Sequence, residues 1–500
     1  MHNLQNVPVL VLGLGVSGLA MARWCARNGA QVTVVDTREV PPQLAKLRLE
    51  LPEVRFIHSR FVPSLLQEND ARIVFKSPGL KPQELLPILQ MAREQEIEIK
   101  GELELFNQEL LRLRVEKKYQ PFVLAITGTN GKTTVTLLTR NILTRSGLNV
   151  AVAGNVGPSL LDTLTARMQE NDLPQVWVLE LSSFQLNEIS SFEPSIGTVL
   201  NISSDHLDWH ENLLAYVRAK KNIFGSLNPM LLNRDDPQVM AMLPPSLKGR
   251  EQRRFISFGL DLPSRPGDFG METVNGMTWL VRAKQVDETT KRRKESLGEI
   301  FIQRLIPANA LRIRGRHNAS NALAALALAC ATNASLGLML YGLREYRGEP
   351  HRVEYVDIIR DVEFFNDSKG TNVGATLAAL TGFEADRKLV VILGGDGKGQ
   401  EFSSLADPVA RFARALVLIG KDAGVIATAL QDTLIPIFRS STLPDAVRVA
   451  FSQAKAGDAV LLSPACASLD MFDNYQHRGQ VFCNTVMELN AEADLQGSIR

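Results

Sequence analysis

The residues whose types and spacing best suit chemistry lie in a glycine-rich turn upstream of the middle of the chain. An apolar run over residues 122–126 predicts a buried strand, and residues 135–146 predict the helix that follows it. In such a turn, backbone N–H groups and a helix N-terminus converge on phosphate oxygens. Lys132 would bring a charge to the terminal phosphates, and the Thr133 hydroxyl can reach a magnesium ion. We therefore predict a nucleotide site formed by Gly128, Thr129, Asn130, Gly131, Lys132, Thr133 and Thr134.

This turn departs from the usual phosphate-loop pattern at one position. That pattern has a glycine about six residues before the lysine, whereas this chain has Ile126 there. An ordinary strand–turn–helix corner is therefore the alternative interpretation. The segment Gly131-Lys132-Thr133-Thr134, directly after an apolar strand, favours the phosphate loop.

Two further predicted strands end in side chains that could hold a metal. Residues 176–179 predict a strand that ends at Glu180, and residues 196–200 predict another that leads to His206. Because the carboxyl ends of parallel strands share one edge of a sheet, both side chains should lie near Thr133 and form a magnesium site. Histidine is an unusual magnesium ligand, so a surface histidine or a helix cap is the alternative for His206. Lys220 lies on a predicted helix, and by itself it indicates only a solvated face.

The start of the chain has the pattern of a site for a nucleotide diphosphate. An apolar strand over residues 7–12 is followed by three glycines in residues 13–18, and Asp36 ends a second strand. A nicotinamide cofactor and any other nucleotide diphosphate fit this pattern equally well. Residues 7–25 lack a basic leader, so they predict a strand and a helix and not a signal peptide or a membrane span. A further strand, over residues 73–75, runs into a turn at Ser77, at the edge where ligands bind.

The last third of the chain again alternates strands with helices. Strands are predicted over residues 362–365, 388–393, 416–419 and 459–462, and polar loops follow three of them. We predict a third open parallel sheet that contributes to substrate binding. The predicted fold class is therefore α/β with three domains: a Rossmann-like domain over 1–112, a central P-loop ATPase-like domain over 113–346 and a Rossmann-like domain over 347–500. The charged residues 112–118 are predicted to be a linker.

Composition excludes several classes of protein. Lys and Arg number 55 against 54 Asp and Glu, so the net charge of +1 gives no reason to expect nucleic acid or an acidic membrane as a partner. The four cysteines are scattered, which suits reduced thiols and no disulfide framework. We expect a cytoplasmic monomer. The strongly charged stretch over residues 284–299 is predicted to be an exposed loop, and the basic insertion around residues 284–304 is longer than is usual for its surroundings.

Taken together, these motifs resemble those of the Mur ligases, the ATP-dependent amino-acid ligases of bacterial cell-wall synthesis. The resemblance covers nearly the whole chain, and residues 127–134 have the form of phosphate loop found in that family, which accounts for Ile126. The other matching segments are Glu180-Leu181-Ser182-Ser183, Asp205-His206-Leu207-Asp208, residues 315–321 and His351-Arg352.

Within this family, the chain is similar to the members that add D-glutamate to UDP-N-acetylmuramoyl-L-alanine. The likeness rests on the first glycine motif with Asp36 and on residues 367–372 and 463–475. The amino-acid-recognition loop of the sister ligases that add diaminopimelate or lysine is not found. The likeness implies that the muramoyl-alanine carboxylate attacks the γ-phosphate of ATP. D-glutamate then attacks the resulting acyl phosphate through its amine, and phosphate leaves.

The resemblance also implies a role for each site residue. The implied catalytic residues are Lys132, Glu180, His206 and Lys220. Two magnesium ions are implied, with the ligands Thr133, Glu180, His206 and Lys220, the last as a carbamate. The implied ATP contacts beyond the loop are Asn318, Asn321, Arg352 and Asp367. The implied contacts to the UDP substrate are Leu14, Val16, Ser17, Asp36, Thr37, Arg38, Ser77 and Asn155. The implied contacts to D-glutamate are Thr371, Lys398, Ser463 and Phe472.

Three other functions stay open at this point. A folylpolyglutamate-type ligase shares the middle motifs but lacks a first domain of this type. A nicotinamide dehydrogenase leaves Lys132, Glu180 and His206 without a role. A P-loop switch protein would hydrolyse its nucleotide without forming an amide. Because the ATP and amino-acid sites are placed on different domains, we expect open and closed states with a hinge near residues 345–350.

Overall fold

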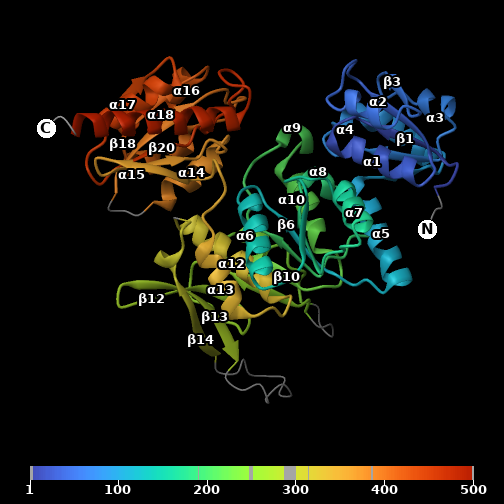
Figure 1. The fold of residues 1–500 in the computed structure, drawn as a ribbon, viewed down its shortest axis with the longest axis horizontal. Helices are drawn as coiled ribbons and strands as arrows, with labels where there is room; N and C mark the ends of the chain where they lie inside the picture. The colour runs from blue at the N-terminus through green and yellow to red at the C-terminus, as the bar shows by residue number, and fades with distance from the viewer. Residues whose placement is uncertain are drawn as a thin grey trace.

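Three stretches of alternating strands and helices form three separate sheets in a computed structural model of the chain (Figure 1). The structure describes residues 4–187, 189, 191–246, 252–285, 300–313, 315–383 and 387–497. Most of the charged stretch over residues 284–299, predicted to be an exposed loop, lies outside the described residues. The three-domain α/β prediction is confirmed.

The first sheet has five parallel strands in the order β3-β2-β1-β4-β5. This is the Rossmann order 3-2-1-4-5-6 without its sixth strand, and the crevice lies at the point where the order reverses. Its elements are β1 (Pro8–Leu12), α1 (Val16–Arg27), β2 (Gln31–Asp36), α2 (Leu44–Glu50), β3 (Arg55–His58), α3 (Ser64–Glu68), β4 (Ile73–Lys76), α4 (Pro82–Glu94), β5 (Glu98–Lys100) and α5 (Glu102–Lys117). The predicted strand and helix over residues 7–25 are confirmed by β1 and α1.

The linker predicted over residues 112–118 is wrong, because these residues end helix α5. Lys118 closes that helix in the left-handed region, with φ of 54°. The charges suggested a linker, but an apolar stripe that includes Phe106 and Leu113 is buried. The Phe106 ring meets Trp177 of the middle domain edge-on, with centroids 5.1 Å apart. The predicted domain boundary after residue 112 therefore falls inside a helix that packs on both domains.

The middle sheet has nine strands in the order β14-β13-β12-β11-β10-β9-β6-β8-β7. The strands from β7 to β12 along this order pair in parallel, and β12, β13 and β14 form an antiparallel meander at one edge. Its elements are β6 (Phe122–Thr127), α6 (Lys132–Arg145), β7 (Val150–Gly154), α7 (Leu160–Gln169), β8 (Val176–Glu180), α8 (Ser183–Leu186), β9 (Ile196–Val199), α9 (Leu207–His210), α10 (Leu213–Lys221), η1 (Asn222–Phe224), β10 (Met230–Asn233), α11 (Pro237–Met240), β11 (Phe255–Phe258), β12 (Phe269–Val274), β13 (Met277–Gln285), β14 (Ile300–Pro307), η3 (Ala308–Ala310), α12 (Arg316–Cys330) and α13 (Leu336–Glu345).

The last sheet has six strands in the order β15-β16-β20-β17-β18-β19. Five of them are parallel, as predicted, but β15 pairs antiparallel with β16, so the sheet is mixed. Its elements are β15 (Glu354–Ile359), β16 (Val362–Asn366), α14 (Val373–Gly382), β17 (Leu389–Gly394), η4 (Ser403–Leu405), α15 (Ala406–Phe412), β18 (Ala413–Ile419), α16 (Ala423–Leu430), η5 (Gln431–Thr433), β19 (Ile437–Arg439), α17 (Leu443–Gln453), β20 (Ala459–Leu462) and α18 (Tyr475–Gly497).

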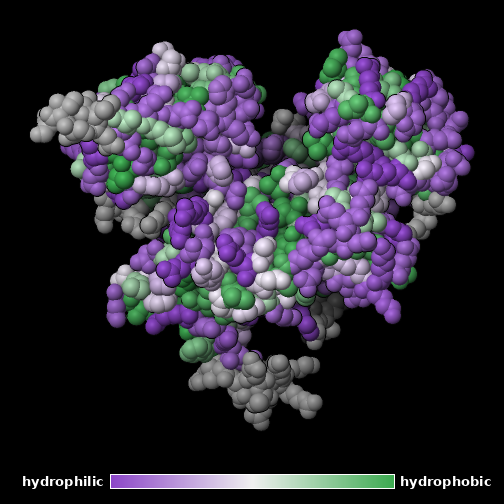
Figure 2. Space-filling view, in the orientation of Figure 1, coloured by the Kyte–Doolittle hydropathy of each residue, from purple (hydrophilic) through white to green (hydrophobic). Residues whose placement is uncertain are grey.

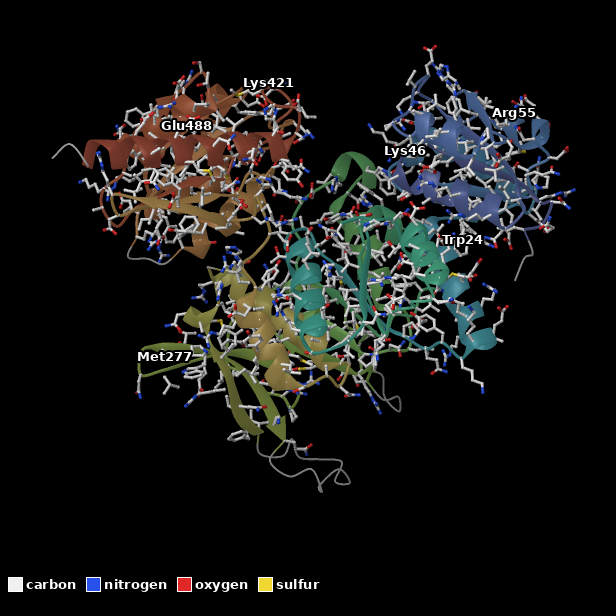
Figure 3. All side chains as sticks on the ribbon, viewed as in Figure 1. Trp24, Lys46, Arg55, Met277, Lys421 and Glu488 are labelled. Carbon is white, nitrogen blue, oxygen red and sulfur yellow. The ribbon has the colours of Figure 1, made fainter. Side chains whose placement is uncertain are left out.

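The hydrophobic cores show which domains are joined firmly. One buried cluster runs from the first domain, where Trp24 is labelled in Figure 3, into the middle domain at Trp177. The last domain has two core clusters of its own on the two faces of its sheet. Figure 2 shows the first and last domains as separate masses above the middle domain. A shared core resists relative motion, so the expected hinge motion belongs to the last domain.

Candidate active site

The backbone of the glycine-rich turn between β6 and α6 is hydrogen-bonded by the Asn201 side chain, which lies just after the end of β9. Asn201 accepts a hydrogen bond from the Asn130 N–H at 2.8 Å and donates to its carbonyl at 3.1 Å. Gly131, at φ 82°, precedes the first residue of α6. A side chain would be strained at this positive φ, and its Cβ would lie 2.7 Å from the Asn321 amide oxygen. The position therefore favours glycine. The helix N-terminus is thus free to face an anion.

Two lysine amines converge on one carbonyl oxygen of this turn. The Nζ atoms of Lys132 and Lys220 each lie 2.8 Å from the Gly128 oxygen. Lys220 is 1% exposed, and burial, reinforced by the neighbouring charge of Lys132, holds the pKa of its amine well below the ordinary value. Burial also lowers the pKa of Lys132, although Glu180 opposes this effect. A neutral amine at Lys220 is nucleophilic, which is the chemical condition for forming a carbamate with carbon dioxide.

Glu180 meets the requirement for a cation ligand at this edge. Its side chain is 1% exposed, and one carboxylate oxygen accepts a hydrogen bond from Asn155 at 2.7 Å. Its other oxygen is buried without a hydrogen-bond partner. An unpartnered buried carboxylate oxygen is costly, and a bound cation would satisfy it. Within the described part of the chain, no group of three His, Cys, Asp or Glu side chains could hold a metal by itself. Magnesium here would therefore also need Thr133 and the phosphates.

His206 lies to one side of this cluster. Its ring is about half exposed and packs edge-on against Phe184, with centroids 4.9 Å apart. Its backbone, at φ 53°, precedes the short helix α9. The structure thus places His206 beside Phe184, which lines the cavity between the first and middle domains described below. Its predicted role as a metal ligand stays a prediction.

The last domain reaches the nucleotide loop through one arginine. Arg352, just after the predicted hinge, donates a hydrogen bond to the Thr133 hydroxyl at 2.7 Å. Asp367 is buried and accepts a hydrogen bond from Ser463 at 2.7 Å. Burial raises the pKa of the Asp367 carboxyl to about 7, against the opposing effects of Ser463 and Arg352. Arg352 therefore contacts the nucleotide loop, whereas Asp367 is hydrogen-bonded within its own domain, and their predicted contacts to ATP stay predictions.

The two asparagines predicted to contact ATP, Asn318 and Asn321, lie in the first turns of α12. Asn321 donates to the Asn318 side-chain oxygen at 3.1 Å and abuts Gly131, as noted above. Their neighbour His317 is partly buried, and desolvation lowers its pKa to about 4. A cavity of about 250 Å³ lies against His317 and Phe383, between the middle and last domains. The cavity is lined by His317 and not by the two asparagines, so their predicted contact to ATP stays a prediction.

A second cavity joins the first domain to the middle domain. Its volume is about 560 Å³, and it contains most of the residues predicted to bind a nucleotide diphosphate. Those residues are Val16, Ser17, Asp36, Thr37, Arg38, Ser77 and Asn155. Leu14 is buried, and its N–H donates to Asp36 at 2.7 Å. That N–H is therefore already hydrogen-bonded within the protein. A Cβ on Gly18 would lie 1.9 Å from the Gly13 oxygen, which explains the third glycine of the motif.

Asp36 is held by partners on both of its oxygens. The Leu14 N–H donates to one oxygen, and the Arg38 side chain donates to both, at 2.8 Å each. Burial acts to raise the pKa of Asp36, but the hydrogen bonds from Arg38 and Leu14 prevail and lower it. The Asp36 carboxylate thus fixes this wall of the cavity. The Arg38 side chain also lines the cavity and is about half exposed.

The four residues predicted to bind the amino acid lie at the carboxyl edge of the last sheet, in different settings. Lys398 is exposed and has φ of 50°, and its N–H donates to Asp396 at 3.0 Å. Thr371 and Phe472 are partly buried. The Ser463 hydroxyl, in contrast, is fully buried against Asp367 and Thr376. Lys398 is therefore the member of this set that is free to reach an anionic ligand.

Comparison with known protein families gives Mur ligase matches in all three domains of the chain. A family model described as the Mur ligase MurD-like N-terminal domain matches residues 7–101. The Mur ligase middle domain matches residues 126–329, and the Mur ligase glutamate ligase domain matches residues 351–466. A protein of Albidiferax ferrireducens is 59% identical over 497 residues, covering 99% of this chain and 98% of its own length.

The chain belongs to the Mur ligase family. The Albidiferax relative is named UDP-N-acetylmuramoylalanine--D-glutamate ligase, and so is a Polaromonas protein that is 51% identical over 98% of this chain and 99% of its own length. The MurF ligase of Thermotoga maritima, solved in complex with ADP, has a TM-score of 0.55 at 14% identity over 99% of this chain and 96% of its own. A MurF of Acinetobacter baumannii also has a TM-score of 0.55, at 17% identity over 96% and 91%. These solved structures bear out the fold.

Family membership also decides between the rival functions. A nicotinamide dehydrogenase and a P-loop switch are set aside, because all three parts of the chain match Mur ligase domains. The MurD-like first domain argues against a folylpolyglutamate-type ligase. The prediction of an ATP-dependent ligase is confirmed. Among the described residues, no helix has the length and apolar character needed to cross a bilayer.

Several residues at this Mur ligase site were given no role from the sequence, although Ser182 and Lys369 lie within the matching segments. Ser182, Phe184 and Gln185 line the cavity between the first and middle domains, and they closely follow the predicted strand end at Glu180. Their position just after a predicted strand end, where ligands bind in parallel sheets, could have identified them. Lys369 donates to the Tyr475 hydroxyl at 3.0 Å, and its charge lowers the pKa of Lys132. This electrostatic effect across two domains has no counterpart in residue spacing.

Proposed function

We propose that this chain is the ATP-dependent ligase that joins D-glutamate to UDP-N-acetylmuramoyl-L-alanine. One observation carries the proposal. Asn155 lines the substrate cavity and donates a hydrogen bond to Glu180 beside the nucleotide loop. The cavity for a UDP substrate and the site for ATP therefore meet at one residue. A carboxylate at this end of the cavity would face the γ-phosphate, as an acyl-phosphate mechanism requires.

The chain's own residues would act mainly by position and charge. The substrate carboxylate attacks the γ-phosphorus and releases ADP, which leaves an acyl phosphate. The D-glutamate amine then attacks the carbonyl carbon, loses a proton, and the tetrahedral intermediate expels phosphate. Lys132 now donates to the Gly128 and Thr129 carbonyls, and it would turn to the transferring phosphate. Arg352 would bring the last domain and its D-glutamate to this point.

Two magnesium ions are part of the proposal. Bound magnesium would neutralise the phosphates and so let two anionic substrates approach each other. Thr133 and Glu180 would hold one ion, and the unpartnered Glu180 oxygen supports that assignment. His206 and a carbamate on Lys220 would hold the other. We further propose a monomer that works in the cytoplasm, and the four free cysteines support a reducing compartment.

A panel of amino acids tests the proposed function. With ATP and UDP-N-acetylmuramoyl-L-alanine present, phosphate release is expected with D-glutamate and not with L-glutamate, L-lysine or meso-diaminopimelate. Omitting the UDP substrate is expected to stop release, because the carboxylate is the phosphoryl acceptor. Release without any amino acid, or preferential release with another amino acid, would contradict the proposal.

Lys398→Ala tests the assignment of the amino-acid site. The exposed amine would pair with a carboxylate of D-glutamate, and a charge-assisted hydrogen bond of this kind is worth roughly 1.5–3 kcal/mol. We therefore expect the KM for D-glutamate to rise about 10- to 100-fold while the KM for ATP stays nearly constant. Initial rates at varied substrate measure this split. The matched control is Lys421→Ala, an exposed lysine of the same domain (Figure 3) whose amine pairs with Asp396. Equal increases in both constants would refute the assignment.

A further inference from the structure

Arg352 stands between two residues whose backbone is held in an unfavourable conformation. His351 has φ of 65° and Val353 has φ of 49°. Residues other than glycine adopt this left-handed region rarely, and a β-branched residue such as Val353 is strained there. Strain of this kind persists only where the surrounding structure fixes the segment. The arginine that contacts Thr133 is therefore presented by a segment that other residues must hold in place.

Asn366, the last residue of β16, is fully buried and contacts this segment on both sides of Arg352. Its amide nitrogen lies 2.9 Å from the His351 Nδ1 and 3.2 Å from a carboxylate oxygen of Glu354. The same Glu354 oxygen accepts a hydrogen bond from the His351 N–H at 2.9 Å. These three residues thus join the start and the end of residues 351–354 to the end of β16.

The orientation of the Asn366 amide is fixed by its other end. Its oxygen accepts a hydrogen bond from the Ser368 N–H at 3.1 Å, and a backbone N–H can only donate. The opposite atom is therefore the NH2 group, and the His351 Nδ1 that it meets must accept. Burial, against the opposing effect of Glu354, lowers the pKa of His351, which favours the neutral ring that this contact needs.

A glycine of α18 makes room for the His351 ring beside Asn366. A Cβ on Gly479 would lie 2.1 Å from the His351 Nδ1 and 3.0 Å from the Asn366 amide nitrogen. The Gly479 carbonyl also accepts a hydrogen bond from that nitrogen at 3.4 Å. Any side chain at position 479 would therefore push the His351 ring away from Asn366.

We propose that Asn366 is a positioning residue: it fixes residues 351–354 so that the Arg352 guanidinium is aligned with the nucleotide loop and the phosphates of ATP. The inference rests on the proposed function, because the contact of Arg352 with ATP is part of it. Asn366 is fully buried, so it would act through Arg352 and not on the ligand itself. A merely structural role would instead weaken the protein in the same way whichever residue occupies position 352.

A double-mutant cycle separates these two roles. Asn366→Asp keeps the shape of the side chain and replaces the donor by an oxygen that faces Glu354. The matched control is Asn490→Asp, which makes the same exchange in the same domain, where the Asn490 amide donates to Asp357 at 2.8 Å. Both substitutions are made in the wild type and in Arg352→Ala, and thermal unfolding checks that each variant is folded.

The measurement is the Kd for ATP with magnesium, by equilibrium dialysis of the full chain without the other two substrates. For Asn366→Asp we expect the Kd to rise about tenfold, because the arginine loses its alignment. Arg352→Ala should bind ATP more weakly as well. Adding Asn366→Asp to it should change the Kd by less than about twofold, because the residue that Asn366 positions is gone. Asn490→Asp should match the wild type.

Gly479→Ala disturbs the same contact from α18 and keeps the inference testable if Asn366→Asp does not fold. Alanine is the better helix former, so the helix itself should not suffer. We nevertheless expect a Kd for ATP about five- to tenfold higher, because the His351 ring must leave Asn366. In Arg352→Ala this effect, too, should nearly vanish.

Three outcomes would overturn the inference. In the first, a folded Asn366→Asp or Gly479→Ala has the wild-type Kd for ATP. In the second, the loss of affinity is equally large with and without Arg352, which would indicate general disruption. In the third, Arg352→Ala itself binds ATP like the wild type. Failure of the proposed function looks different, because the wild type would then bind ATP but release no phosphate with D-glutamate.

Discussion

Lys132→Ala is expected to lower ligase turnover by about a hundred- to a thousandfold. The amine is the positive group nearest to the transferring phosphate in the proposed reaction, and removing one such group from a preorganised site typically costs about 10²–10³ in rate. The fold should persist, because Nζ contacts only two carbonyls of its own loop and Lys220 still donates to one of them. Phosphate release measures turnover, and thermal unfolding measures stability.

The control for this experiment is Lys132→Arg. It keeps the charge, but a planar guanidinium cannot occupy the position of a compact ammonium between the two carbonyls. We expect it to remain strongly impaired as well, which would show that placement and not charge alone matters. Substantial ligation by Lys132→Ala, at an unchanged unfolding temperature, would remove the lysine from the mechanism.

Much of the fold follows from apolar runs that are buried on both faces of parallel sheets. Residues 176–179 predicted β8 and the position of Glu180 at its end, because a short apolar run that ends in a charge has few other solutions. Helix α5 was missed because its exposed charges hid a buried stripe. The antiparallel β15 was missed because an edge strand has only one pairing partner and a weaker apolar signal.

The candidate site, like the fold, could be predicted only in part from the sequence. The strand-end rule brought Glu180 beside the nucleotide loop, since that rule depends only on topology. It could not show that Arg352 would reach Thr133, because that contact depends on how two domains meet. The sequence suggested a solvated face for Lys220, and the resemblance alone gave it a role. In the structure its amine is buried on the Gly128 carbonyl, a contact made across 92 residues.

Lys220→Ala is expected to be nearly inactive and to regain part of its activity with formate or acetate. Truncation removes the buried nitrogen on which the proposed carbamate forms, and it leaves a space beside Gly128 and Thr127. A short-chain carboxylate that enters this space would supply the anionic oxygens that the carbamate provides. Phosphate release at increasing carboxylate concentration measures the rescue.

The neighbouring lysine provides the control. Lys221 is exposed on the same helix, so Lys221→Ala should keep wild-type turnover and show no response to carboxylates. Chloride at equal ionic strength separates rescue by a carboxylate from a general salt effect. If Lys220→Ala stays active, or if it is folded and inactive but unresponsive to every small carboxylate, an anionic Lys220 is ruled out. Its effect would then be that of the amine itself, donating to the Gly128 carbonyl from beneath the nucleotide loop.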